Sequence, residues 1–327
     1  MEKGKSQNAL MKHIRDEHRI EIGGSVHKRM IQEMGYYHGY KAYRFLKNVK
    51  NKAHHNNFSQ IVSTYNYDNR LKQILYPYVM RLETILKNIV IDELVSSEGV
   101  TFDKIYEQKL TRYREMSSSD KNYSQEMKRR LELKRNFDAA VSNAYGKNPI
   151  VEHFVNASKA LPIWAEFELI TLGTFGNFVG RLNTDIKLNI AKKIGTYNKS
   201  NDTSGMMLER HIFILKELRN SIAHNGIIFD TRFQKSRIDK SVKKQLANEF
   251  QLSDVAFSTI VDYLLLVLHY FKAVGVTKTE LKQLIRDFES ATQDFENTLS
   301  DTGIFFGIVG SDYLLKLQAM RDFINRK

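Results

Sequence analysis

Proline is scarce in this chain. Its 327 residues include only three prolines, Pro77, Pro149 and Pro162. Proline lacks a backbone N–H and breaks helix interiors, so a chain with few prolines can hold long uninterrupted helices. A β-fold with many turns would need more such breakers. The scarcity of proline therefore favours an all-α fold.

Apolar residues recur at helical spacing along much of the chain, which supports the same fold class. The longest such run in the first half covers residues 67–98. Pro77 lies inside it and is expected to bend this helix or to separate its first turns from the rest. The residues of the apolar stripe are Leu71, Ile74, Tyr78, Leu82, Ile85, Leu86 and Ile89.

Other segments are also expected to be helical. A first helix starts near Ser25 as its N-cap, points Val26, Met30, Ile31 and Met34 inward and stops near Gly35. Two helices flank the polar break at 117–120, and a short helix lies on each side of a Gly-Thr-Phe-Gly break within 161–181. The remaining expected helices cover 204–223, 254–273, 277–298 and 310–325. The inward residues of the helix at 204–223 are expected to be Met207, Ile212, Leu215, Leu218 and Ile222.

These patterns predict three regions. The first is a basic, aromatic-rich helical region at 1–65. The second is a helical domain at 66–275 with a helical insertion at about 101–147, and the third is a set of C-terminal helices at 276–327.

Composition excludes several classes of protein. The chain has no cysteine, so disulfides, thiolate zinc sites and cysteine nucleophiles are excluded. Its most apolar stretch, 255–274, contains Asp262, His269 and Lys272. Because each central charge costs about 2.5–3.5 kcal/mol in a bilayer, we interpret this stretch as a buried helix. We expect no membrane association and a cytoplasmic location.

Positive charge is concentrated at the N-terminus. The chain carries a formal charge of +13, and residues 1–60 hold 12 Lys and Arg against 5 Asp and Glu. Cations contact phosphates and aromatic rings stack on unpaired bases, so this region suits a nucleic acid. A basic protein with tyrosines in its core is the alternative. The candidate contact residues are Tyr36, Tyr37, Arg44, Lys47, Lys50 and Lys52.

The histidines show no metal-ligand pattern. His54 and His55 are adjacent and would point to different faces of a helix, while His13 and His18 are five residues apart. We interpret them as surface or RNA-contacting residues and expect neither a metal nor a cofactor. The segment Ile22-Gly-Gly-Ser25 lacks the Gly-Lys-Ser/Thr ending of a nucleotide loop, so ATP use is not expected.

The segment around Arg219, Asn220 and His224 carries the most chemical information. Four residues separate Arg219 from His224 at the end of an expected helix that stops at Asn225-Gly226. Asn220 and His224 share a helix face, whereas Arg219 lies about 140° round the helix from His224. A histidine near neutrality can move protons to or from ribose and phosphate oxygens, and a guanidinium can stabilise phosphorane charge. The alternative is that Arg219 pairs with Glu217 or Glu209 while His224 only caps the helix.

Several short motifs, taken in order, resemble the Abi-like abortive infection family, the AbiD/AbiF proteins of bacterial anti-phage defence. They span about 30–230. The motifs are Gly35-Tyr36-Tyr37 with Gly39-Tyr40, Tyr67-Asp68 with Arg70-Leu71, Arg81-Leu82-Glu83, Pro162-Ile163-Trp164, Leu172-Gly173-Thr174, and Leu218-Arg219-Asn220 with Ala223-His224.

This resemblance implies a HEPN-like helical bundle with N-terminal and inserted helical elaborations. It also implies a homodimer that builds one ribonuclease site from two Arg–His motifs, and a structured noncoding RNA that restrains the toxin. By the family's pattern Arg219, Asn220 and His224 are catalytic. The same pattern places Arg81 and Glu83 in the same cleft. The alternative for Arg81 and Glu83 is an ion pair on the helix surface. Asn225 stands where the family often has a second histidine, and Arg232 only loosely matches a following basic residue.

The function expected from these observations is that of a metal-independent endoribonuclease. The ribose 2′-hydroxyl would attack the phosphorus and leave a 2′,3′-cyclic phosphate, so DNA is not an expected substrate. Two alternatives stay open: a non-catalytic RNA-binding protein that keeps the HEPN fold, and a DNA-binding accessory protein.

Overall fold

The computed structural model describes residues 6–48, 50–95, 101–197, 202–299 and 301–326. Within these residues the only strand-like contacts are three isolated bridges, and the rest of the regular structure is helical. The all-α prediction is therefore confirmed. The α-helices are α1 Gln7–His18, α2 Gly24–Met34, α3 Phe58–Val95, α4 Phe102–Gln108, α5 Lys121–Ala144, α6 Pro149–Asn156, α7 Ile163–Leu169, α8 Leu172–Arg181, α9 Thr184–Lys193, α10 Met207–Ala223, α11 Lys240–Phe250, α12 Ile260–Ala273, α13 Lys278–Leu299, α14 Thr302–Val309 and α15 Tyr313–Asn325.

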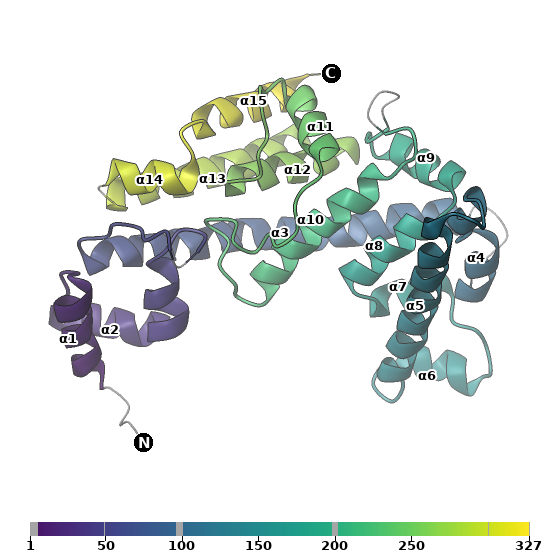
Figure 1. Cartoon of the computed structure of the whole chain (residues 1–327), viewed down its shortest axis with the longest axis horizontal. Helices are drawn as coiled ribbons and strands as arrows, with labels where there is room; N and C mark the ends of the chain where they lie inside the picture. The colour runs from purple at the N-terminus through teal and green to yellow at the C-terminus, as the bar shows by residue number, and fades with distance from the viewer. Residues whose placement is uncertain (1–5, 49, 96–100, 198–201, 300, 327) are drawn as a thin grey trace.

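Helix α3 connects the two ends of the molecule. It runs for 38 residues without interruption, and Pro77 lies inside it. The prediction that Pro77 separates the first turns is wrong. All of the expected stripe is buried or packs against the core. In Figure 1, α3 crosses the whole molecule, with α1 and α2 at one end and α4–α9 around the other. The boundary expected at 65/66 falls within this helix.

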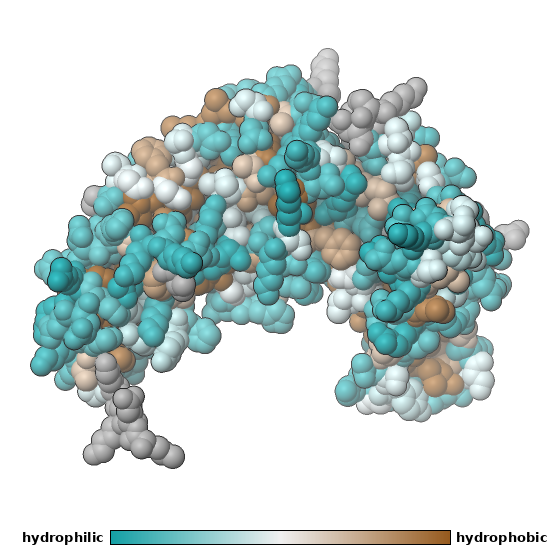
Figure 2. Space-filling model, viewed as in Figure 1, coloured by the Kyte–Doolittle hydropathy of each residue, from teal (hydrophilic) through white to brown (hydrophobic). Residues whose placement is uncertain are grey.

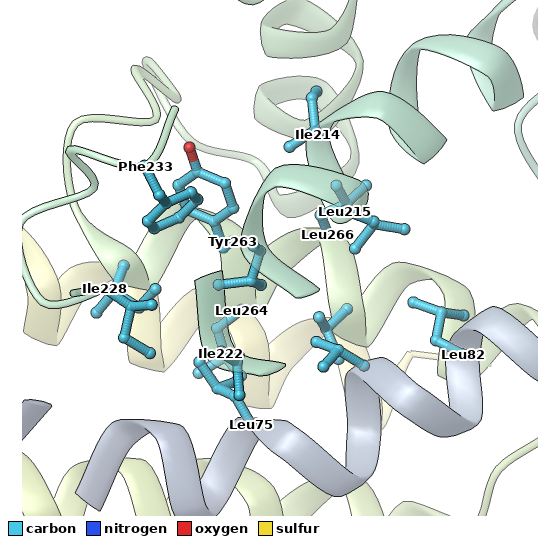
Figure 3. Packing of buried hydrophobic residues seen from close by; sticks show 14 of the residues in the cluster. Leu75, Leu82, Ile214, Leu215, Ile222, Ile228, Phe233, Tyr263, Leu264 and Leu266 are labelled. Atoms are coloured by element: carbon cyan, nitrogen blue, oxygen red, sulfur yellow. The ribbon is translucent and has the colours of Figure 1, made fainter. Parts of the chain in front are cut away.

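Helix α10 packs against α8 and α3, and its His211 ring is hydrogen-bonded to the Tyr270 hydroxyl of α12 at 2.8 Å. Its predicted inward residues, which include Leu215 and Ile222, are all buried. Figure 3 shows Ile222 beside Leu75 of α3 and Leu264 of α12, within one buried apolar cluster. One apolar cluster includes buried residues from both α1 and α15, so the C-terminal helices share their core with the rest of the chain.

The insertion folds onto α7 and α8 through α5. Asp120 caps α5 with its side chain, as expected for a helix after the polar break. Arg130, one of the basic residues of α5, is buried and donates to the carbonyl oxygens of Tyr106, at 2.6 Å, and Leu110, at 2.9 Å. This arginine holds the chain that follows α4.

The N-terminal helices differ from expectation in their details. Helix α1 precedes the first helix that the sequence predicts, and α2 is capped by Gly23, with Ser25 already inside the helix. Val26 is 65% exposed, so its predicted inward position is wrong, whereas Ile31 and Met34 are buried as expected. The helix ends at Gly35, whose φ of 74° suits glycine.

The space-filling view in Figure 2 shows a hollowed face between the two ends of the molecule. Helices α1 and α2 lie on one side of this hollow, and the helices around α5 and α6 lie on the other. Among the described helices, none has the length and apolar character to cross a membrane.

Candidate functional site

Helix α10 ends abruptly at Ala223. His224 is the residue after the helix, Asn225 adopts a φ of 52°, and the Gly226 N–H donates to the Ser221 carbonyl at 2.6 Å. Asparagine and glycine tolerate such geometry, which confirms the predicted stop. The turn leaves His224 exposed at the surface.

A cavity of about 720 Å³ lies beside this helix end. Three parts of the chain line it: the middle of α3, residues 168–173 around the start of α8, and the last turns of α10. Arg219, Asn220 and His224 all face this cavity. The structure thus brings the three predicted catalytic residues together.

Glu83 holds the guanidinium of Arg219. The Glu83 carboxylate is about nine-tenths buried and lies 2.9 Å from Arg219 Nε and 3.1 Å from Lys87 Nζ. Lys87 also donates to the Ile170 carbonyl at 3.2 Å. A buried carboxylate between two cations is stabilised by both of them, and it fixes their positions in turn. Lys87 was not predicted as a site residue from the sequence motifs, although Glu83 and Lys87 are four residues apart and so share a helix face.

The partners proposed from sequence for Arg219 are engaged elsewhere. Glu217 pairs with Lys216 at 3.1 Å, and Glu209 lies 3.5 Å from Arg181. Arg219 keeps 26% of its side chain exposed, and its Nη1 donates to Asn220 Oδ1 at 3.2 Å. The guanidinium is therefore oriented while one edge stays open to the cavity.

Arg81 lies outside this cavity, so its predicted place in the cleft with Glu83 is wrong. It forms an ion pair with Glu280 of α13, and its guanidinium lies 5.3 Å from the Phe271 ring. Residues two apart on a helix face nearly opposite directions, which separates Arg81 from Glu83. Arg81 instead lines a second cavity between α3 and α13.

Asp68 anchors the segment that follows His224. Its fully buried carboxylate accepts hydrogen bonds from the backbone N–H groups of Ile228 and Phe229, each at 2.8 Å. Tyr43 donates its hydroxyl to Asp68 at 2.6 Å. Lys72 lies 2.8 Å from the same carboxylate and also donates to Asn225 Oδ1 at 3.1 Å. Asp68 therefore fixes the chain beside the candidate catalytic histidine.

Arg232 does not line the Arg219 cavity and instead has a structural role. It pairs with Asp230 at 2.6 Å and donates to the carbonyl oxygens of Ala42 at 2.8 Å and Phe45 at 2.7 Å. These bonds attach the segment after α10 to the basic N-terminal region. Through Arg232, the N-terminal region is thus hydrogen-bonded to the segment that follows His224.

The predicted RNA contacts lie apart from the cavity, on the N-terminal arm. Lys47, Lys50 and Lys52 are exposed, and Arg44 is half-buried with its guanidinium 5.8 Å from the Tyr40 ring. Tyr37 is 71% exposed, Tyr36 is half-buried, and the Lys41 ammonium lies within 5.2 Å of both rings.

The histidines of this arm do not all match the prediction of a surface position. His55 is buried, which is contrary to that prediction, and its burial lowers its pKa to about 4. Burial and then the nearby Arg44 lower the pKa of His18 to about 4. Both rings are therefore neutral near pH 7. His54 is exposed.

The fold and the site define an all-helical protein with an Arg–Asn–His group at the end of one helix. The sequence profile described as Abi-like protein matches residues 29–230, well over half of the chain. The chain therefore belongs to the family of Abi-like proteins, and this family points to abortive infection. Comparison with curated proteins and with solved structures found no match.

Proposed function

We propose that this protein is a metal-independent endoribonuclease of the HEPN type that acts as an abortive infection toxin. The observation that carries the proposal is the shared cavity of Arg219, Asn220 and His224, with His224 exposed at its rim. Membership of the Abi-like family supports the biological setting.

The cavity has the groups that ribose-directed cleavage needs. The 2′-hydroxyl would attack phosphorus, so that the new P–O2′ bond forms as the P–O5′ bond breaks. An imidazole accepts the hydroxyl proton and an imidazolium delivers one to the departing O5′ atom. Arg219 stabilises the negative charge that gathers on the phosphorane oxygens. Residues 171–173 at the start of α8 also line the cavity, and the N-terminal end of a helix favours a nearby anion such as a phosphate.

Two copies of the chain would serve this chemistry better than one. A single imidazole must both remove and deliver a proton, whereas paired sites supply one imidazole for each task. The exposure of His224 allows a second copy to approach it. We propose a homodimer on these grounds, in line with the HEPN resemblance.

We also propose that a structured RNA binds and restrains the protein. The exposed Lys47, Lys50 and Lys52 and the exposed ring of Tyr37 are suited to phosphates and unpaired bases. Arg232 attaches this arm to the segment after His224, so RNA bound there would lie on a part of the fold connected to the site.

Incubation of purified protein with RNA and DNA of the same sequence in EDTA tests the proposal. We expect cleavage of RNA, no cleavage of DNA, and no loss of activity on chelation, because the attacking group belongs to the ribose. Tight RNA binding without cleavage would instead support a non-catalytic RNA-binding protein. Preferential binding of DNA would support a DNA-binding accessory.

A further inference from the structure

A second pocket, unrelated to Arg219, opens between the insertion and the chain that leads into α7. Its volume is about 440 Å³, which is within the usual range for small-molecule sites. Helices α4 and α5 form two walls, and residues 155–166 form the rest. Apolar side chains, among them Phe102, Val141 and Leu161, cover much of its lining.

Glu166 lies at the base of this pocket. The residue is 9% exposed, and its Oε2 atom has no hydrogen-bond partner within the part of the chain that the structure describes. Buried carboxylates are ordinarily paired or hydrogen-bonded, because an isolated one is costly. Glu83 differs from Glu166 in that two cations, Lys87 and Arg219, lie beside its carboxylate. Glu166 is therefore an acceptor that faces a cavity large enough for a ligand.

The charges around the pocket favour a cation. Asp138 is exposed on α5, and Asp103 on α4 lies 2.6 Å from Lys134. Lys159 is exposed on the opposite side and is the one cation among the lining residues. The lining thus combines apolar walls and one ammonium with three carboxyl groups, of which Asp103 is already paired with Lys134 while Asp138 and Glu166 remain for a ligand. This combination suits a positive group on a carbon chain better than a hydrated inorganic ion.

We propose that this pocket binds a small organic cation, an alkylammonium or guanidinium compound, whose charged group pairs with Glu166 and whose carbon chain lies along Phe102 and Val141. Asp138 provides a second anionic contact nearer the opening. The site is independent of the proposed ribonuclease activity, because it shares no residue with the Arg219 cavity.

The protonation state of Glu166 predicts how binding of a cation depends on pH. Burial, and then the charges of Asp103 and Asp138, raise the pKa of Glu166 to about 8, while Lys134 acts in the opposite direction. Lys159 is the other charged group that faces the pocket. At pH 7 the empty site therefore holds a neutral acid. A bound cation favours the carboxylate, so binding releases a proton, and the affinity rises with pH until Glu166 is ionised.

Titration calorimetry on the RNA-free protein tests the site with agmatine and putrescine as probes. We expect both to bind, with an affinity about tenfold higher at pH 9 than at pH 7, as follows from a carboxyl that titrates near pH 8. At pH 7 the measured heat should differ between phosphate and Tris buffers, which reports the released proton. Neutral butanediol should not bind.

Matched variants identify the residue responsible. Glu166→Gln keeps the shape of the side chain and is expected to weaken binding about tenfold to hundredfold and to abolish its pH dependence. Asp138→Asn should weaken it by a smaller factor. Glu132→Gln removes an exposed carboxylate from α5 outside the pocket and should change nothing. Unchanged binding in folded Glu166→Gln, equal binding of butanediol, or no binding of either cation would each overturn the proposal.

Discussion

Replacement of His224 by alanine is expected to lower the rate of RNA cleavage about 10²–10⁴-fold, the range for loss of a general acid or base. The side chain is exposed at the end of α10, so the fold should lose little stability. The rate is measured with excess protein over labelled RNA, to isolate the chemical step. His153→Ala, at another exposed histidine, is the matched control and should cleave at the wild-type rate.

Arg219→Ala is expected to lower the same rate by about 10²–10³-fold, because the guanidinium stabilises charge that develops in the transition state. Arg219→Lys keeps the charge but loses the planar set of donors, so it should recover only part of the rate. Arg210→Ala changes an arginine on the same helix that lies outside the Arg219 cavity, and it serves as the control. Wild-type cleavage by both Arg219→Ala and His224→Ala would contradict the assigned site.

Asp68→Ala is expected to lower the free energy of unfolding by about 3–5 kcal/mol. The change leaves the Lys72 ammonium and the Ile228 and Phe229 N–H groups without the buried acceptor they share. Urea denaturation followed by circular dichroism measures this loss. Asp68→Asn keeps a carbonyl oxygen for the backbone N–H groups and should lose less.

The control for this prediction lies on the same helix. Asp92 is 75% exposed and pairs with Lys193 at the surface, so Asp92→Ala should change the unfolding free energy by less than about 1 kcal/mol. A similar effect of Asp68→Ala and Asp92→Ala would show that the buried carboxylate does not anchor the segment after α10.

Long, strongly periodic helices were predictable from the sequence. The stripe of α3 and the inward residues of α10 are buried as expected, because packing follows the helical period. The polar helices α9 and α11 were not predicted. The expected break at Gly-Thr-Phe-Gly lies instead at Ile170–Thr171, where Thr171 caps α8. Local glycines do not end a helix whose face is held by tertiary packing.

The candidate site was predictable in part. Arg219, Asn220 and His224 share a cavity because the helix end brings them together. The arginine side chain reaches Asn220, whose Oδ1 accepts a hydrogen bond from Arg219 Nη1 at 3.2 Å. The roles of Glu83 and Lys87 depend on α10 packing across α3, which a single sequence does not specify. Asp68 was visible only as part of a motif, since the two backbone N–H groups that it binds lie about 160 residues further along the chain.

Cleavage of an RNA in which one 2′-deoxyribose replaces the ribose on the 5′ side of a mapped cleavage position tests the central claim most directly. In EDTA we predict that cleavage stops at this linkage alone, and that the unmodified RNA yields 2′,3′-cyclic phosphate and 5′-hydroxyl ends. Cleavage at the substituted linkage at the original rate, or products with 5′-phosphate ends, would contradict the account.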